Sequence, residues 1–97
     1  MKHQDSRRTL YEFEYPITKL LVMHEDAEVG NHYHLKKDEE FMLVSGEGTL
    51  NGKDMMLFES HLIKAGTPHT FNLKKDSVLL GFCTRPYDPT DDYDSPR

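Results

Sequence analysis

The stretch Gly30-Asn31-His32-Tyr33-His34-Leu35-Lys36-Lys37-Asp38-Glu39 decides how the rest of the chain is interpreted. Its two histidines lie two residues apart, and a glutamate follows five residues after the second one. Thirty positions after that glutamate, the segment Ala65-Gly66-Thr67-Pro68-His69 adds a third histidine. Imidazole and carboxylate groups are the ligands that borderline divalent metals prefer. The central question is therefore whether these four side chains meet in space.

Composition indicates a small globular protein and excludes several classes of partner. The chain has 97 residues, of which 36% are hydrophobic and 30% charged, and this favours one domain. The net charge of −5 argues against nucleic-acid binding, which needs a basic surface. No apolar run approaches the roughly 20 residues that span a bilayer, and the first eight residues lack the apolar core of a signal peptide. We therefore expect a cytoplasmic protein that binds no nucleic acid and no membrane.

Apolar segments separated by Gly and Pro predict an all-β domain over residues 9–84. No segment has a sustained helical period, so a barrel or sandwich is the expected architecture. Asn51-Gly52 is a strong hairpin signal. We expect strands at 9–14, 17–24, 30–34, 39–45, 55–58, 60–63, 69–73 and 77–83.

The two ends of the chain are expected to lie outside this domain. Residues 1–8 are polar and predict a flexible N-terminal segment. Residues 85–97 are acidic and proline-rich, and we expect a solvated C-terminal tail without regular structure. The only cysteine, Cys83, cannot form an intrachain disulfide and is expected to be a small buried side chain on the last strand.

Strand parity decides which of the candidate side chains can share a face. On a strand, His32 and His34 project the same way, about 6.6 Å apart, and Tyr33 projects the opposite way. Two imidazoles at that spacing can bind one metal ion. His69 follows a Gly-Thr-Pro turn, which would hold a third imidazole in place.

The carboxylate ligand is chosen by the same parity argument. Glu39 begins the next strand and shares its face with Phe41, which we expect to point into the interior. Glu40 has the opposite parity, and Asp38 lies in the loop. The predicted metal ligands are therefore His32, His34, Glu39 and His69.

The spacing of these residues resembles the first motif of the cupin superfamily, which is His-x-His, three or four residues, Glu, six residues, Gly. In this chain those positions are His32, His34, Glu39 and Gly46. The second cupin motif is Pro-x-Gly, two residues, His, three residues, Asn, and Gly66 and His69 fit it. Lys64 stands in place of its proline, and Asn72 comes one residue early.

The resemblance implies a small jelly-roll β-barrel with a divalent transition metal inside it. In cupins the set of three histidines and one glutamate commonly holds such an ion, and here Zn, Fe, Mn or Ni are the expected choices. The string Gly30-Asn31-His32-Tyr33-His34 is also similar to a Gly-Asn-His-x-His segment of cupins that act on nucleotide-linked sugars in polysaccharide synthesis. This similarity implies a sugar isomerase or epimerase that works next to a carbonyl. In the absence of metal, His32 or His34 would act as the general base.

Two other functions stay open on the sequence. A non-haem iron dioxygenase uses histidine and carboxylate ligands with open positions for O₂. A non-enzymatic module would bind a metal or a small ligand without turnover. A pocket for a compact substrate, or simply the core, would be formed by Phe41, Leu43, Met55, Leu57 and Phe71.

We also expect a homodimer. Met42 and Val44 are apolar and lie on the strand face opposite Glu39. In so small a barrel the chain itself has little left to cover that outer face.

Overall fold

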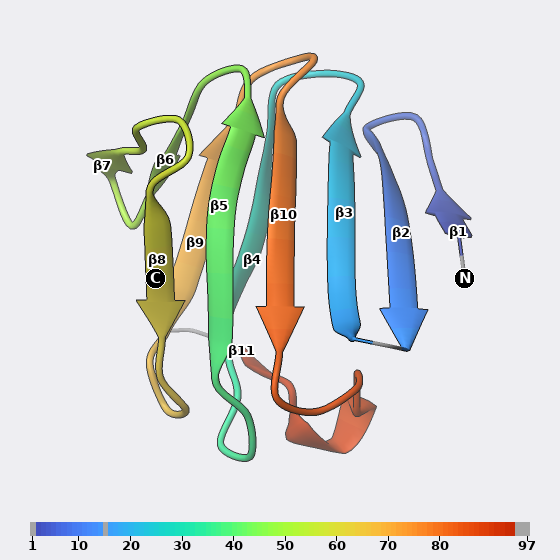
Figure 1. The fold of residues 1–97 in the computed structure, drawn as a ribbon, viewed down its shortest axis with the longest axis vertical. Helices are drawn as coiled ribbons and strands as arrows, with labels where there is room; N and C mark the ends of the chain where they lie inside the picture. Colours follow the sequence, from blue (N-terminus) through green and yellow to red (C-terminus); the bar gives the residue numbers. More distant parts are fainter. Residues whose placement is uncertain (1, 15, 95–97) are drawn as a thin grey trace.

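Two antiparallel sheets make up the computed structural model, which describes residues 2–14 and 16–94 (Figure 1). In spatial order the first sheet contains β1 (Lys2–Gln4), β2 (Arg8–Glu14), β3 (Ile17–Met23), β10 (Val78–Cys83), β5 (Glu39–Ser45) and β8 (Ser60–Ile63). The second sheet contains β11 (Tyr93–Asp94), β4 (Ala27–Tyr33), β9 (His69–Leu73), β6 (Gly48–Leu50) and β7 (Lys53–Asp54). A short 3₁₀ turn, η1 (Pro89–Asp91), precedes β11.

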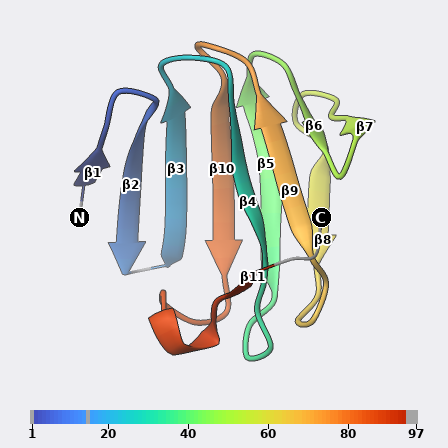
Figure 2. The same cartoon turned by 180° about the vertical axis from the view of Figure 1, so that it is seen from behind.

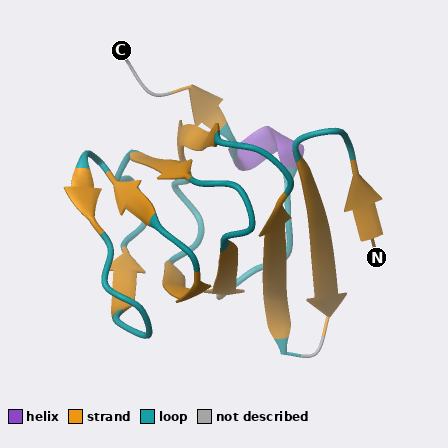
Figure 3. Cartoon of the chain, turned by 90° about the horizontal axis from the view of Figure 1, so that it is seen from above, coloured by secondary structure: helices purple, strands orange, loops and turns teal. Residues whose placement is uncertain are grey.

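The sheets pack face to face, and the core lies between them. β4 and β9 lie behind β10 and β5 in Figure 1 and in front of them in Figure 2, and Figure 3 shows the arrangement from above. This is a jelly-roll arrangement, so the predicted all-β fold class is confirmed. Within the described ranges no helix is long and apolar enough to cross a membrane. The buried apolar side chains are Leu21, Met23, Val29, Phe41, Leu43, Met55, Ile63, Phe71, Leu73 and Leu79.

The central strand β5 follows the predicted alternation. Glu39, Phe41 and Leu43 are buried and point into the interior, whereas Met42 and Val44 are half-buried on the outer face. A strand with apolar residues on both faces needs cover on both. Here the second sheet covers the inner face.

Strand β4 contains a β-bulge that positions the histidines. Its register with β9 shifts between Gly30 and His32, so Asn31 is an extra residue in the strand. Gly30 and Asn31 have φ angles of 89° and 64°, a conformation that glycine adopts freely and asparagine tolerates. Regular alternation would place residues three apart on opposite faces, but the bulge turns both Val29 and His32 inward. The strand begins at Ala27, earlier than the predicted residue 30.

The segment 55–58 was predicted to be a strand, and this prediction is wrong. Only Met55 is buried, as a single core residue. Phe58 has a φ of 64°, and its backbone N–H donates to the Leu43 carbonyl at 2.9 Å, so the chain turns here. The hairpin predicted at Asn51-Gly52 is confirmed, and it joins β6 to β7.

Both ends of the described chain pair with the sheets. Residues 2–4, expected to be loose, form β1 and pair with β2. In the segment 85–97, expected to be an irregular solvated tail, η1 is followed by β11, which pairs with β4. Met1 and residues 95–97 lie outside the described residues. The domain boundaries after residues 8 and 84 stay a prediction, but each end contributes a short strand to a sheet.

Two glycines with the same backbone conformation provide a test of the packing where β5 ends. Gly46 and Gly52 have φ angles of 89° and 82°. A Cβ on Gly46 would lie 2.6 Å from Cα of Ser77, whereas a Cβ on Gly52 meets nothing within 4 Å. We expect Gly52→Ala to cost about 1 kcal/mol through its positive φ alone, and Gly46→Ala to cost about 3 kcal/mol or more because backbone must also move. Urea unfolding of both variants measures the difference, and equal losses would contradict the predicted clash.

Candidate metal centre

The four predicted ligands lie at strand ends on one side of the molecule, where β4 ends and β5 and β9 begin (Figure 1). His32 lies in β4 and His34 just after it, Glu39 is the first residue of β5, and His69 is the first residue of β9. His34, Glu39 and His69 are only 4%, 3% and 2% exposed, and His32 is partly exposed. The bulge in β4 pairs His32 directly with His69.

The distances between these side chains suit a shared ion. One ring nitrogen of each histidine lies within 4.8 Å of those of the other two. Oε1 of Glu39 lies 3.2 Å from Nε2 of His34 and 3.6 Å from Nε2 of His69. The three imidazoles therefore face a common space, and the carboxylate of Glu39 borders it beside His34 and His69.

Backbone carbonyls hold two of the rings by their outer nitrogens. Nδ1 of His34 donates to the carbonyl of Asp91 at 2.6 Å, and Nδ1 of His69 points to the carbonyl of Thr67 at 3.5 Å. A carbonyl can only accept, so Nδ1 carries the proton in each ring. In the neutral ring, Nε2 then has a lone pair directed at Glu39, which is how metal-binding histidines are usually oriented.

The third ring is held by a carboxylate from the C-terminal segment. Nδ1 of His32 lies 3.3 Å from Oδ1 of Asp92. The same reasoning assigns the proton to Nδ1 and leaves Nε2 free to bind an ion. Nδ1 of His34 and Nδ1 of His69 thus face backbone carbonyls, and Nδ1 of His32 faces the carboxylate of Asp92.

Two buried atoms at the centre lack hydrogen-bond partners. Among the described residues, neither Nε2 of His34 nor Oε1 of Glu39 makes a hydrogen bond. These two atoms are 3.2 Å apart, and with the proton on Nδ1 both present lone pairs to each other. Buried acceptors in such a position need a proton or a cation between them. The donor set thus fits a divalent ion.

Electrostatics keep His32 and His69 in the form that binds metal. Burial lowers the pKa of His69 to about 4, although Glu39 acts in the opposite direction. Burial also lowers the pKa of His32, against the effect of the Asp92 carboxylate. Both imidazoles are therefore neutral at pH 7, as coordination requires.

Glu39 is held in its ionised form. Burial acts to raise the pKa of Glu39, but the ammonium groups of Lys19 and Lys37, together with His69 and His34, hold it below its ordinary value. A buried carboxylate that stays charged is a strong ligand for a divalent cation.

Sequence reasoning missed the part played by the C-terminal segment. Asp91 was expected in a solvated tail, but it is only 3% exposed. Its carboxylate accepts from the backbone N–H groups of Leu35 at 2.9 Å and Lys36 at 3.0 Å, and its carbonyl holds His34. The tail therefore fixes the loop that carries the second histidine.

A local signal for this ordering was present in the sequence. Asp88 precedes Pro89 and caps η1, since its Oδ1 accepts from the N–H of Thr90 at 2.9 Å. Asp followed by Pro at the first position is a common way to start a helical turn. After the turn, Tyr93 stacks on Tyr33 with ring centroids 5.2 Å apart. This contact holds β11 against β4.

Apolar side chains close the interior next to the four ligands. The ring centroid of Phe41 lies 6.0 Å from that of His69 and 4.8 Å from that of Phe71. Met55 is also buried in this core, whereas Leu57, predicted to line the same space, is 48% exposed in the turn after it.

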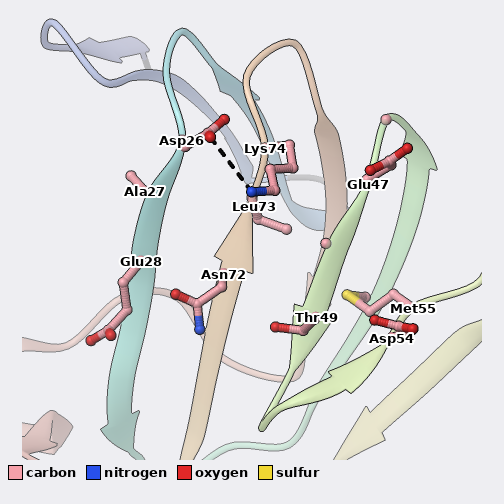
Figure 4. A pocket seen from close by; sticks show the side chains of 12 residues that line it. Asp26, Ala27, Glu28, Glu47, Thr49, Asp54, Met55, Asn72, Leu73 and Lys74 are labelled. Carbon is pink, nitrogen blue, oxygen red and sulfur yellow. Dashed lines mark ion pairs between the residues drawn. The ribbon is translucent and has the colours of Figure 1, made fainter.

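A surface hollow lies at the ends of β4 and β9 opposite the histidines, and Figure 4 shows the side chains that line it. It has a volume of about 660 Å³ and is lined by the upper ends of β4, β9 and β6, with Glu28, Asn72 and Thr49 as cross-strand neighbours. Asp26 and Lys74 form an ion pair of 3.6 Å at its rim. The four predicted ligands do not line this hollow, so it is separate from the candidate metal centre.

The chain matches known proteins in structure and not in sequence. No protein-family model and no curated protein matches it. CapF, a capsular polysaccharide assembling protein from Staphylococcus aureus, matches with a TM-score of 0.85 at 21% identity, over 100% of this chain and 32% of that chain. A sugar phosphate isomerase of the cupin superfamily from Silicibacter pomeroyi matches with a TM-score of 0.67 at 22% identity, over 80% and 59% of the two chains. KdgF from Halomonas sp. matches with a TM-score of 0.69 at 15% identity, over 93% of this chain and 90% of that chain.

These matches confirm the predicted fold. The chain has the jelly-roll fold of the cupin superfamily, as its two motifs implied. The chain spans about a third of the length of CapF, so the two proteins share one region.

The bulge at Asn31 can be tested by two variants that lose the same side-chain hydrogen bond, which Asn31 accepts from Thr70 at 3.2 Å. Valine strongly disfavours a φ of 64°, whereas glycine adopts it freely. We expect Asn31→Val to weaken Zn²⁺ binding at least about tenfold, since His32 loses its orientation, and Asn31→Gly to change it by less than about threefold. Competition with a chromophoric chelator measures both affinities. The same loss in both variants would show that the bulge does not control the site.

Proposed function

We propose that this protein binds a divalent transition metal through His32, His34, Glu39 and His69 and acts as an isomerase or epimerase on a sugar or a nucleotide-linked sugar. One observation carries the proposal: Nε2 of His34 and Oε1 of Glu39 are buried, directed at each other and without a hydrogen bond among the described residues. A bound cation would satisfy both atoms and draw in the other two histidines.

The donor set restricts the metal by its chemistry. Three imidazole nitrogens and one carboxylate oxygen suit Zn, Fe, Mn or Ni, and the choice among them depends on supply as well as on affinity. The proton on Nδ1 of each histidine, fixed by Asp91, Thr67 and Asp92, would orient the rings toward such an ion.

The substrate class is supported by the names of the structural neighbours. They include a capsular polysaccharide assembling protein and a sugar phosphate isomerase. CapF has also been solved with the inhibitor 3-isopropenyl-tropolone, which carries neighbouring oxygen atoms able to chelate a metal. A carbonyl with an adjacent hydroxyl on a sugar would present oxygen atoms in a similar way.

The reaction would be a proton transfer next to a carbonyl. When bound, the metal would act as a Lewis acid and polarise the carbonyl oxygen of the substrate. His34, Glu39 and His69 are buried and would hold the ion rigidly, while Phe41 and Phe71 keep bulk water away from its inner side. In metal-free protein, His32 is the best placed base, because it is partly exposed and the Asp92 carboxylate orients its ring.

Two neighbouring glutamates give a matched test of the metal centre. Glu39→Gln removes the ligand charge in the interior, whereas Glu40→Gln makes the same change on the outer face, where Glu40 accepts from Ser60. We expect Glu39→Gln to weaken Zn²⁺ or Ni²⁺ binding by about 100-fold or more and Glu40→Gln by less than about twofold. Metal analysis of the purified proteins and chelator competition provide the measurement. Unchanged uptake by Glu39→Gln would refute the ligand set.

The reaction class is tested with the same proteins. Metal-loaded protein in D₂O should introduce deuterium next to the carbonyl of a sugar or nucleotide-sugar substrate, and Glu39→Gln should lose this exchange. Consumption of O₂ in place of exchange would identify the alternative, a dioxygenase. Ligand binding seen as a thermal shift without any turnover would identify a binding module.

The outer face of the first sheet is proposed to form a homodimer interface with a second copy of this chain. Leu80 lies between its cross-strand neighbours Leu20 and Met42, and all three are half-buried by their own chain. Phe82, further along β10, is 39% exposed. A flat apolar face that crosses three strands is suited to a symmetric contact, since each copy presents the same surface.

Light scattering with size-exclusion chromatography tests the dimer. We expect the unmodified protein to elute as a dimer and Leu80→Glu to elute as a monomer, because the charge would be buried in the contact. Met56→Glu makes the same kind of change at an exposed site in the 55–58 turn and should leave the dimer intact. A monomeric unmodified protein would rule out the interface.

A further inference from the structure

Glu39 separates two groups of side chains, and the metal centre uses only one of them. Its Oε1 faces His34 and His69, whereas its Oε2 faces away from them. Oε2 lies 3.7 Å from Nζ of Lys19 and accepts from Sγ of Cys83 at 3.4 Å. A second cluster of polar groups thus lies next to the candidate metal centre.

Lys37 completes this second cluster, and its ammonium group is unsatisfied. The residue is 4% exposed, and Nζ is buried without a hydrogen bond among the described residues. Lys37 precedes the buried Glu39 by two positions in the chain. Burial and the charge of Lys19 hold the pKa of Lys37 below its ordinary value, whereas Glu39 and Cys83 act in the opposite direction. A buried ammonium without partners is costly and is rarely kept in a protein without a use.

The charges of the cluster do not balance. In the interior, the ammonium groups of Lys19 and Lys37 act on the single carboxylate of Glu39, whereas Asp88 and Asp91 lie with Lys37 at a hollow on the surface. Glu39 is shared with the histidines, and a divalent cation bound there would add two further positive charges. In a poorly hydrated interior such an excess favours an anionic ligand strongly.

A ligand can reach the cluster from the open end of the interior. The side chain of Lys19 is 22% exposed and that of His32 is 29% exposed, so both groups of side chains border solvent. Lys37 also lines a surface hollow of about 390 Å³ with Arg85 and Tyr87. The side chains of both lysines therefore border openings to solvent through which an anion could enter.

We propose that Lys19 and Lys37 form a subsite that binds an anionic group of the substrate, a carboxylate or a phosphate, next to the metal centre. This inference rests on the proposed function and narrows it to acidic or phosphorylated sugars. With the anion held by the two lysines, the neutral part of the sugar would extend toward the histidines. The anion would also supply the hydrogen-bond acceptor that Lys37 lacks.

Binding of inorganic phosphate and of acetate to Lys37→Met and Lys19→Met tests the subsite. Each anion is titrated separately, by calorimetry, into metal-free and Ni²⁺-loaded protein. We expect the unmodified protein to bind at least one of them in both states, and each variant to bind it at least about tenfold more weakly. Lys53→Met removes the same charge from an exposed strand of the hairpin and should bind within about twofold of the unmodified protein.

The two anions separate the possible ligands, since a preference for phosphate indicates a phosphorylated sugar and a preference for acetate indicates a sugar acid.

Urea unfolding adds an independent measurement. Lys37→Met should unfold at the same urea concentration as the unmodified protein or higher, because Nζ has no bond to lose. Anion affinities in Lys37→Met and Lys19→Met equal to that of the unmodified protein would overturn the proposal. A clear loss of stability in Lys37→Met would also count against it, since it would reveal a structural role.

The metal-free titration separates failure of the subsite from failure of the proposed function. A protein that takes up no metal, yet loses anion binding in Lys37→Met, would refute the metal centre and support the subsite. If metal uptake depends on Glu39 and anion binding is unchanged in Lys19→Met and Lys37→Met, the metal centre is supported and the subsite is refuted.

Discussion

The candidate site depends on one backbone constraint, the bulge formed by Gly30 and Asn31. Strict alternation along β4 continues from the buried Val29 and would turn His32 and His34 out toward solvent. The additional residue reverses that alternation and pairs His32 with His69. The reversal needs two consecutive residues with positive φ, which glycine and asparagine adopt more readily than other residues. The sequence before the histidines is therefore as important to the site as the histidines themselves.

Orientation of two of the three imidazoles comes from groups that are distant in the chain. The carbonyl of Asp91 and the carboxylate of Asp92 hold two of the rings by Nδ1, and the carbonyl of Thr67 holds the third. These contacts leave every Nε2 directed inward before any ligand binds. Preorganisation of this kind reduces the entropy that binding would cost. The C-terminal segment is thus part of the site, although it adds almost nothing to the apolar core.

Glu39 lies between the histidines and the lysines of the interior, because its two oxygen atoms have different neighbours. Oε1 faces imidazoles, and Oε2 faces the ammonium group of Lys19. The positive groups keep the carboxylate ionised against the effect of burial. Structural matches at 21% and 22% identity show that the chain shares its fold with a capsular polysaccharide assembling protein and a sugar phosphate isomerase. The fold supports many functions, so the side chains around Glu39 carry the functional argument.

The sequence by itself determined the all-β class, the inward face of β5 and the set of three histidines with Glu39, because period two and motif spacing are local properties. It placed His32 and His34 on one face of the strand but did not decide whether that face points into the interior or toward solvent. The bulge decides this, and the bulge depends on the pairing of β4 with β9. Only the tertiary structure brought Asp91 against His34 and left the ammonium of Lys37 beside Lys19. Those contacts join residues far apart in the chain or depend on how a loop folds inward. Which residues meet there is decided by tertiary packing, and a local sequence pattern does not predict it.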